Sequence, residues 1–530
     1  MLITPELGRY LASVSRDIGR QVAVIIDRKG QIPFVVVGDN RGITIPGLSD
    51  YSLGPRRLRG LRVVHTHLKD EPLSSEDMTD LALLRLDLFA ALGVTQGGEP
   101  GKMYIGYLLP PNPKDKTWAE APGRPFHQLD LDPSEFVAAL EEEMLRVQGE
   151  AFDVKDTRER GILVSVMPKS SRASQKEAME ELVELARSAD VLVMETVMQR
   201  SAKINPRYLM GEGKLKEIII TALQKGATLL IFDQELTPSQ IRSITELAEI
   251  KVIDRSQLIL DIFARRAHSR DGKVQVELAQ LSYRLPMLTG KGTALSRLMG
   301  GIGGRGPGET KLETDRRRVR DRIAHLQRQL AELSRARGQR KSRRAEAGFP
   351  IISIVGYTNA GKSTLLNALT RSATIVEDKL FATLDTASRR LRFPRDRDVI
   401  ITDTVGFIRD LPAPLLAAFR ATLEELMDAD LLMHVVDVSN PRFEEQMLSV
   451  EKTLTALGLD DKGRLLVFNK ADQVDPDIAF MVARRYGGVA VSALVKKSLP
   501  PLMAELEERL WPEGSGGGPG GGLGMEGTHG

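Results

Sequence analysis

A chain of 530 residues is too long for one hydrophobic core, and its length predicts roughly three or four domains. Its net charge of +3 is nearly neutral, and its hydrophobic and charged fractions, 42% and 27%, are ordinary for globular proteins. The absence of cysteine excludes disulfides, thiolate zinc sites and thiol catalysis. No apolar run approaches the ~20 residues of a membrane span, and the N-terminus lacks the pattern of a secretion signal. We expect a cytoplasmic monomer, with peripheral association with membranes left open.

Residues 1–110 are predicted to form an α+β domain of their own. Two strand-like runs, "QVAVIID" and "IPFVVVGD", lie on either side of the turn "RKGQ". The segment Leu108–Pro125 is rich in proline and charge, which is typical of a linker. Residues 111–160 are therefore expected to be a linker followed by a helix.

Residues 161–270 alternate apolar strand runs with amphipathic helix patterns, which predicts an α/β domain with a parallel sheet. Residues 271–347 carry two stripes of apolar residues with the spacing of coiled coils. Each stripe is only about two heptads long, so we expect an antiparallel helical hairpin, joined by a glycine-rich loop over Thr289–Thr310. The stripes comprise Val274, Leu278, Leu281, Leu285 and Leu288 in the first helix, and Val319, Ile323, Leu326, Leu330 and Leu333 in the second.

A second α/β domain is predicted over residues 348–512, with a mostly parallel, doubly wound sheet. It starts with the strand-like run "IISIVG", which leads into a glycine-rich loop and a helical pattern. Residues 513–530 are rich in glycine and are expected to be disordered. The chain is thus expected to be an α/β multidomain protein.

The loop "GYTNAGKS", Gly356–Ser363, matches the phosphate-binding motif G-x-x-x-x-G-K-S in the strand–loop–helix context that the motif requires. The N–H groups of such a loop and the start of the helix bind phosphate oxygens. Lys362 supplies a positive charge for the β- and γ-phosphates, and the hydroxyl of Ser363 is a ligand for Mg²⁺. The sequence thus predicts a P-loop site for a nucleoside triphosphate.

Three further motifs follow, each at the carboxyl end of a strand-like run, where doubly wound sheets bind ligands. Asp403 and Gly406 have the D-x-x-G spacing that positions the magnesium shell and the γ-phosphate. "NKAD" ends in Asp472, whose carboxylate can accept hydrogen bonds from the N1–H and the exocyclic amine of guanine. Adenine has an acceptor at N1, and a mismatch of this kind can discriminate by ~10⁴. With "SAL" at residues 492–494, these motifs predict a guanine nucleotide.

Phe407 stands where many nucleotide hydrolases carry a glutamine that orients water. A phenyl ring cannot hydrogen-bond a nucleophile, so either the chain is no hydrolase or the catalytic group comes from elsewhere. Asn359 is similar to the asparagine through which some GTPases bind K⁺, a cation that would replace the charge of an arginine finger. The simplest interpretation of the ring itself is that it packs into its own domain.

The motifs "GYTNAGKS", "FATLD", "DTVGF", "NKAD" and "SAL", with "GGIGGRGPGETKLETDRRRVRDRI" upstream, resemble those of the HflX family of translation-factor-related GTPases. The resemblance covers about Gly161–Trp511. It implies GTP hydrolysis that is slow alone and stimulated by the ribosome, and dissociation or rescue of ribosomes through the large subunit under stress. It also implies that Thr383, which spacing alone leaves undecided, is a switch threonine on Mg²⁺. A nucleotide-switched signalling or scaffold module and a tRNA-modification GTPase stay open as alternatives.

These motifs and the resemblance define the expected nucleotide site. The catalytic residues are expected to be Asn359, Lys362, Thr383 and Gly406. The ligands of Mg²⁺ are expected to be Ser363 and Thr383, with Asp403 acting through water. The nucleotide-binding residues are expected to be Gly356, Tyr357, Thr358, Asn359, Ala360, Gly361, Lys362, Ser363, Phe381, Ala382, Thr383, Leu384, Asp385, Asp403, Thr404, Val405, Gly406, Asn469, Lys470, Ala471, Asp472, Ser492, Ala493 and Leu494.

The stretch Lys311–Arg344 holds 13 lysines and arginines against 4 acidic residues, which indicates either a solvated helix face or a surface for nucleic acid. The preceding loop is either a flexible linker or an RNA-binding tip whose glycines let the backbone approach a crowded surface. The resemblance implies that this tip probes the peptidyl-transferase region of ribosomal RNA. The residues expected to contact RNA are Lys291, Arg297, Arg305, Lys311, Arg316, Arg317, Arg318 and Arg320.

The stretch Val63–Leu81, "VVHTHLKDEPLSSEDMTDL", does not belong to the family core. His65 and His67 fall on one face of a strand, and Asp77 follows in an S-x-x-D pattern. Two imidazoles and a carboxylate are a plausible set of zinc ligands.

This pattern is similar to that of JAB/MPN metallopeptidases, but it departs from them in three ways. Leu68 replaces a proline, the spacing to the serine is one residue shorter, and no Glu lies between Glu6 and His65, where the general base should be. The favoured interpretation is therefore two ordinary strand histidines beside a capped helix, without zinc. A metal-binding relative that lacks peptidase activity is the second interpretation, and a peptidase is the third.

Overall fold

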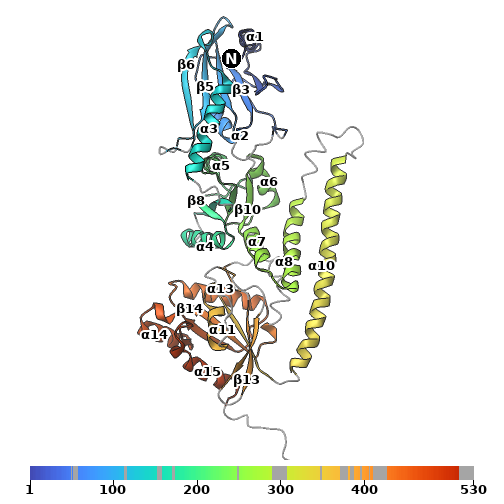
Figure 1. The fold of residues 1–530 in the computed structure, drawn as a ribbon, viewed down its shortest axis with the longest axis vertical. Coiled ribbons are helices and arrows are strands. Elements are labelled where there is room, and N and C mark those ends of the chain that lie inside the picture. Colours follow the sequence, from blue (N-terminus) through green and yellow to red (C-terminus); the bar gives the residue numbers. More distant parts are fainter. Residues whose placement is uncertain are drawn as a thin grey trace, which may run out of the picture. The chain divides into compact units, whose positions relative to one another are not determined.

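The computed structural model describes most of the chain as two compact units, Met1–Arg255 and Ser256–Gly530 (Figure 1). Within the part of the chain that is described, no helix is long and apolar enough to cross a membrane. The described residues are 1–48, 50–51, 58–110, 112, 116–151, 158–169, 174–247, 250–288, 307–345, 349–370, 380–381, 387–393, 397–404, 406–409 and 426–512.

The first unit begins with a six-stranded sheet of order β2-β1-β3-β4-β5-β6. β3 and β4 are parallel and connected through α2, whereas the other neighbouring strands are antiparallel. The predicted hairpin around "RKGQ" is confirmed, because β1 and β2 pair directly. The elements are α1 (Pro5–Ile18), β1 (Val22–Asp27), β2 (Phe34–Val37), β3 (Leu61–His67), α2 (Ser75–Leu84), β4 (Leu88–Val94), β5 (Pro100–Leu108), β6 (Trp118–Pro125), η1 (Phe126–Gln128) and α3 (Pro133–Ala151).

The prediction of a linker over Leu108–Pro125 is wrong for its second half. From Trp118 the chain forms β6, which pairs with β5 and extends the sheet beyond residue 110. β6 itself contains Pro122 and Pro125, which an edge strand tolerates, and Trp118, Ala121 and Pro125 are partly buried at intervals along it. The helix expected before residue 160 is α3, which packs apolar side chains into the same core.

The rest of the first unit is a four-stranded parallel sheet of order β10-β9-β7-β8, as the alternating pattern predicts. One hydrophobic cluster runs from Leu2 to Val252, so the two sheets of this unit share a continuous core. Helix α5 contributes Leu215, Ile218 and Ile219 to that core. The elements are β7 (Arg160–Pro168), α4 (Gln175–Ser188), β8 (Leu192–Ser201), α5 (Glu212–Gln224), β9 (Leu229–Phe232), α6 (Pro238–Leu247) and β10 (Lys251–Asp254).

The second unit contains the predicted helical hairpin, in which α8 and α10 lie side by side (Figure 1). An ion pair between Arg322 of α10 and Glu277 of α8 joins them at 2.7 Å. The loop prediction is wrong at its end, because α10 starts at Pro307, a residue favoured at the first helical position. At 39 residues α10 is also much longer than two heptads, since its charged residues are good helix formers. The elements are α7 (Arg255–Arg266), α8 (Arg270–Arg284), η2 (Leu285–Leu288) and α10 (Pro307–Ala345).

The last part of the second unit is a six-stranded sheet of order β12-β13-β11-β14-β15-β16, in which only β12 is antiparallel. The doubly wound α/β domain is confirmed. Its parallel strands end at one edge, where the sequence motifs meet. The elements are β11 (Ile351–Gly356), α11 (Lys362–Thr370), β12 (Ala387–Arg392), β13 (Asp398–Asp403), β14 (Leu431–Asp437), α13 (Phe443–Ala456), β15 (Arg464–Asn469), η3 (Ala471–Gln473), α14 (Pro476–Tyr486), β16 (Val489–Ala490), η4 (Lys496–Ser498) and α15 (Pro500–Leu510).

Candidate functional site

The phosphate-binding motif forms a tight loop between the end of β11 and the start of α11. Asn359 and Gly361 adopt left-handed backbone conformations, with φ of 62° and 86°. A Cβ atom at Gly361 would lie 2.3 Å from the side-chain nitrogen of Asn469, so this position requires glycine. The loop therefore packs its backbone closely against the strand that carries the "NKAD" motif.

Lys362 lies at the centre of this loop with its side chain buried. Its Nζ donates to the carbonyl oxygens of Gly356 at 3.2 Å and Tyr357 at 2.9 Å. Burial lowers the pKa of Lys362 to about 8, although the nearby carboxylate of Asp403 acts in the opposite direction. A cation enclosed by a loop at a helix N-terminus is an arrangement suited to polyphosphate.

Ser363 and Asp403, two of the three expected magnesium residues, are brought into direct contact. The Ser363 hydroxyl donates to Oδ2 of Asp403 at 2.6 Å. Asp403 ends β13 beside β11 and is 1% exposed. A hydroxyl and a carboxylate side by side are the oxygen ligands that suit Mg²⁺, so this pair fits the ion. The third residue, Thr383, lies outside the described residues, as do Ala382, Leu384, Asp385 and Val405.

Phe407 is bonded through its backbone to the phosphate loop. Its N–H donates to the carbonyl of Gly356 at 3.1 Å, and its carbonyl accepts from the N–H of Thr358 at 2.7 Å. The side chain is 2% exposed, which confirms that the ring packs into its own domain. At Gly406, an added Cβ would lie 2.8 Å from Thr358 Cγ2 and 2.9 Å from Lys362 Nζ. The D-x-x-G segment thus contacts the phosphate loop too closely for any side chain at Gly406.

Asn469 connects three of the predicted motifs. Its amide nitrogen donates to the carbonyl of Ala360 at 2.9 Å, and its amide oxygen accepts from the N–H of Ala493 at 2.9 Å. Asp472 follows in η3 with an exposed carboxylate. The amide of Asn469 thus holds the phosphate loop and the "SAL" loop to one strand end.

One residue of this edge escaped the sequence interpretation. Asp437 ends β14 and pairs with Lys470 Nζ at 2.7 Å, which helps to hold Lys470 in a left-handed conformation with φ of 59°. Its other oxygen, Oδ1, accepts from the N–H and hydroxyl of Ser439. The signal in the sequence was an acidic residue directly after a buried strand, at the edge where the other motifs lie.

Comparison with known proteins agrees with this geometry. The models of three protein families match consecutive parts of the chain: "GTP-binding GTPase N-terminal" over residues 176–264, "GTP-binding GTPase Middle Region" over 266–344 and "50S ribosome-binding GTPase" over 351–470. "GTPase HflX" of Caldanaerobacter subterraneus subsp. tengcongensis is 47% identical over 356 residues, covering 67% of this chain and 82% of that protein. "GTPase HflX" of Escherichia coli K12 is 41% identical over 362 residues, covering 68% and 84%.

The chain belongs to the HflX family of GTPases. The family resemblance found in the motifs is confirmed, and with it a P-loop GTPase whose substrate is GTP. Among solved structures, a GTP-binding protein from Sulfolobus solfataricus in complex with GDP is 25% identical, with a TM-score of 0.37, covering 66% of this chain and 99% of that one. Residues 1–175 lie outside the three family models.

In this HflX-family chain, Phe381 is the described residue of the "FATLD" motif. Its ring is 2% exposed and packs edge-on against Phe263 of α7, with 4.6 Å between the ring centroids. Its backbone is left-handed, with φ of 58°, which is unfavourable for a bulky residue. Packing against α7 therefore holds the start of this motif in a strained conformation.

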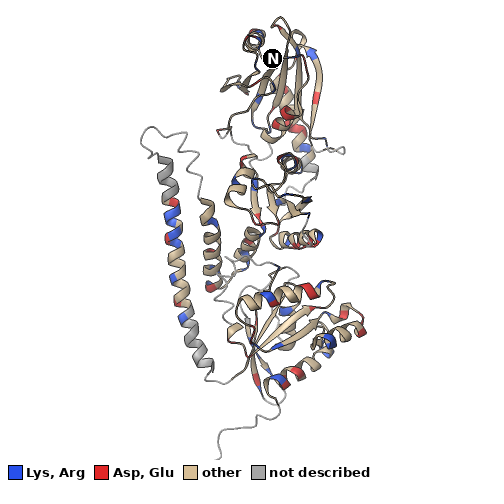
Figure 2. Ribbon diagram, turned by 180° about the vertical axis from the view of Figure 1, so that it is seen from behind, with Lys and Arg blue, Asp and Glu red and all other residues tan. Residues whose placement is uncertain are grey.

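Lys and Arg gather along helix α10, the second helix of the hairpin (Figure 2). Arg317, Arg318 and Arg320 are exposed, and Arg316 is partly buried. Of the other residues expected to contact RNA, Lys291, Arg297 and Arg305 lie outside the described residues, and Lys311 is described only in its backbone. The described arginines thus place at least three cations on one short stretch of helix.

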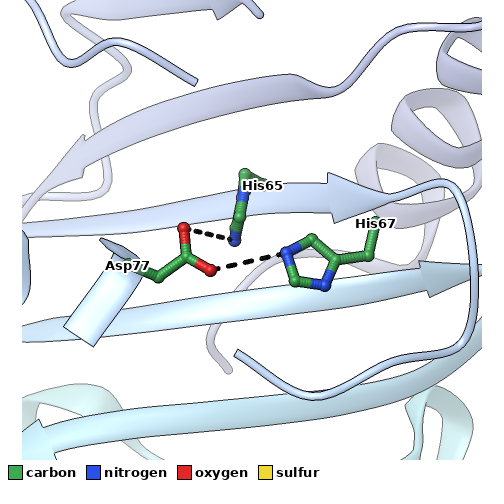
Figure 3. Close-up of side chains that lie close together, drawn as sticks. All are labelled: His65, His67 and Asp77. Atoms are coloured by element: carbon green, nitrogen blue, oxygen red, sulfur yellow. Dashed lines mark ion pairs between the residues drawn. The ribbon is translucent and has the colours of Figure 1, made fainter. Parts of the chain in front are cut away.

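The three residues of the N-terminal histidine pattern converge inside the first unit (Figure 3). Nε2 of His65 lies 3.7 Å from Oδ1 of Asp77, and Nε2 of His67 lies 3.5 Å from Oδ2. Ser74 caps α2 and exchanges hydrogen bonds with Asp77, which confirms the capped helix. Burial lowers the pKa of His65 to about 4. Burial alone would raise the pKa of Asp77, but its partners His67, His65 and Ser74 bring it to about 2.

Proposed function

We propose that this GTPase binds the large ribosomal subunit and uses the binding and hydrolysis of GTP to dissociate or rescue ribosomes under stress. The observation that carries the proposal is the row of exposed arginines on α10, within the same compact unit as the nucleotide site. Such a row suits the phosphates of RNA, because it gives affinity without base readout. The description of the family model over 351–470, "50S ribosome-binding GTPase", supports the same partner.

Within the nucleotide site, the phosphate loop binds the triphosphate through its N–H groups and Lys362. Bound Mg²⁺ would neutralise charge on the β- and γ-phosphates, held by Ser363 and Thr383 and, through water, by Asp403. Gly406 lets its backbone approach the γ-phosphate because it carries no side chain. The guanine base is selected by Asp472, while the "SAL" loop closes the base pocket.

Hydrolysis is slow in the isolated protein, because the buried ring of Phe407 gives water no hydrogen-bond partner. Phosphoryl transfer depends on positioning and charge compensation, so the missing glutamine lowers the rate without removing the reaction. The large subunit supplies order or charge when it binds. The exposed side chain of Asn359 in the phosphate loop is also accessible to K⁺, which would add a positive charge there.

The proposal is tested by sedimentation of the chain with purified large subunits in GTP, GDP and a non-hydrolysable analogue. We expect binding in GTP and in the analogue, weaker binding in GDP, and phosphate release that the subunits accelerate at least about 10-fold. Rates of hydrolysis measured in K⁺ and in Na⁺ buffers distinguish the contribution of a K⁺ ion bound at Asn359 from that of the subunit. Equal binding in all three nucleotides would contradict the proposal and favour a scaffold that merely carries nucleotide.

A charge reversal tests the row of arginines on α10. Changing Arg316, Arg317, Arg318 and Arg320 to Glu should weaken subunit binding and flatten its salt dependence, because each phosphate contact contributes roughly one unit to the slope of log K against log salt. The matched control reverses four exposed cations of the first unit that lie outside its strands, Arg9, Arg20, Lys29 and Arg41. Subunit binding that is equal in both variants would show that the row of arginines on α10 is only a solvated helix face.

A further inference from the structure

The histidine cluster lies in the N-terminal sheet, within residues 1–175, which the three family models do not cover. β3 leads into α2, and the strand's alternation puts His65 and His67 on the same face. Asp77 lies in the first turn of α2, and its carboxylate points between the two rings (Figure 3). The candidate ligand atoms of the three residues all lie within 4.8 Å of one another, and all three side chains are buried.

The hydrogen bond at Nδ1 of each ring determines whether Nε2, the nitrogen nearer to Asp77, carries a proton or a lone pair. Nδ1 of His67 lies 3.1 Å from the carbonyl oxygen of Glu71, and a carbonyl can only accept, so Nδ1 carries the proton. Nδ1 of His65 lies 3.2 Å from Oε1 of Gln21, which favours the same tautomer. In their neutral forms, which a metal ligand requires, the rings therefore turn the lone pairs of both Nε2 atoms toward the carboxylate of Asp77. Contacts of this kind on the distal nitrogen are typical of histidines that bind metals.

Two lone pairs that face a carboxylate repel it unless a positive charge lies between them. Nε2 of His65 is fully buried and has no hydrogen-bond partner among the described residues. The Nε2–oxygen separations of 3.5 and 3.7 Å are too long for good hydrogen bonds. Tetrahedral coordination with bonds of about 2.0–2.2 Å separates neighbouring ligand atoms by roughly 3.4 Å, which is close to these values.

We propose that His65 Nε2, His67 Nε2 and the Asp77 carboxylate bind a divalent cation of the Zn²⁺ class. Two imidazoles and one carboxylate suit zinc better than the oxygen-seeking Mg²⁺ or Ca²⁺. The ion ties β3 to α2, and a water molecule completes its coordination. The site is buried, and the sequence has no Glu between Glu6 and His65 that could serve as a general base. The ion therefore stabilises the fold and performs no hydrolysis. The proposal departs from the favoured sequence interpretation, in which the histidines hold no metal, and takes up the second one, a metal-binding domain without peptidase activity.

The test uses the full chain without a histidine tag, freed of metal by a chelator and then supplied with Zn²⁺ alone. After dialysis, elemental analysis should find about one equivalent of Zn²⁺ that resists removal. The variants are His67→Gln and Asp77→Asn, of which the second keeps an oxygen that can accept from the Ser74 N–H. The matched control is His127→Gln, an exposed histidine of the same unit. Retained GTP binding and an unchanged circular dichroism spectrum show that each variant folds.

A second readout measures the thermal stability of the first unit. In a Trp511→Phe background, Trp118 of β6 is the one tryptophan, so its fluorescence follows unfolding of the first unit. Zn²⁺ should raise the melting temperature of this unit by on the order of 5 °C in the wild type and the control, but not in the two variants. Co²⁺ in place of Zn²⁺ should give the absorption of a tetrahedral site. Wild type that holds no more zinc than His67→Gln, or a melting temperature that zinc leaves unchanged, would overturn the proposal.

Discussion

The side-chain amide of Asn469 donates to the carbonyl oxygen of Ala360 at 2.9 Å, so the strand that carries the guanine motif is fastened to the phosphate loop. The other end of the same amide accepts from Ala493 in the loop that follows β16. Both contacts are buried, where an unpaired polar group costs about 1–3 kcal/mol. These two contacts hold the phosphate loop and the "SAL" loop to the end of β15.

Asn469→Ala should therefore damage both stability and binding. The change leaves the Ala360 carbonyl and the Ala493 N–H without their partner, so we expect the GTPase domain to lose about 2–4 kcal/mol of unfolding free energy. GDP affinity should fall at least about 10-fold, because the phosphate loop is no longer held. Denaturant titration followed by Trp511 in a Trp118→Phe background, and titration with a fluorescent GDP analogue, measure the two effects.

Asp472→Asn provides the contrasting variant at the same edge. Its carboxylate is exposed, so stability should change by less than about 0.5 kcal/mol. Guanine binding should weaken by ~10² or more, because an amide nitrogen would face the N1–H of guanine. Xanthine presents a carbonyl in place of the exocyclic amine, so affinity for XTP should rise. A variant that keeps its preference for GTP would show that Asp472 does not read the base.

The variant Phe407→Gln tests whether a glutamine at this position raises the basal rate of GTP hydrolysis. The ring is buried and its backbone is paired with the phosphate loop, so a glutamine would leave space and bury an amide. We expect a loss of about 2–4 kcal/mol and no gain in basal hydrolysis. The control is Phe407→Leu, which keeps the position apolar and should cost about half as much. Faster single-turnover hydrolysis by Phe407→Gln would refute this account of the residue.

The contact between Phe263 and Phe381 predicts coupling between α7 and the segment that contains Thr383. An edge-on aromatic pair is worth about 0.5–1.5 kcal/mol beyond burial, and here it also holds the left-handed backbone of Phe381. A double-mutant cycle with Phe263→Leu and Phe381→Leu should show a coupling energy in this range. Each single change should also lower basal hydrolysis several-fold. Additive effects would mean that the rings do not act as a pair.

The sequence predicted those parts of the site that depend on spacing along the chain. Each motif lies at the end of a parallel strand, so the strand order alone brings Ser363 to Asp403 and Asn469 to Ala360. The sequence did not predict contacts that depend on packing between elements. Whether Asp77 would reach the two histidines depends on the angle at which α2 crosses β3. That angle is set by apolar packing, which no local pattern encodes.

The buried ring of His434 in β14 should make the stability of the GTPase domain depend on pH. Its ring is 1% exposed, and burial, with the nearby cations of Arg464 and Lys362, lowers its pKa to about 4. The carboxylate that faces it is that of Glu451, 3.6 Å from Nδ1. In the unfolded chain the pKa of histidine is about 6.5, so between these values the unfolded state binds more protons. Stability should be complete above about pH 6.5 and fall as the pH drops toward 4, by on the order of 3 kcal/mol.

The measurement follows Trp511 in a Trp118→Phe background, so that denaturant unfolding of the GTPase domain is seen alone. Trp511 is a suitable reporter because it packs against Phe393 in the core of that domain. Other groups also titrate in this range, and the decisive quantity is therefore the difference between the wild type and His434→Gln at each pH. This difference should change between pH 6.5 and 4, whereas His325→Gln, at an exposed histidine of α10, should follow the wild type throughout. A difference that is constant with pH would mean that the buried ring of His434 does not resist protonation.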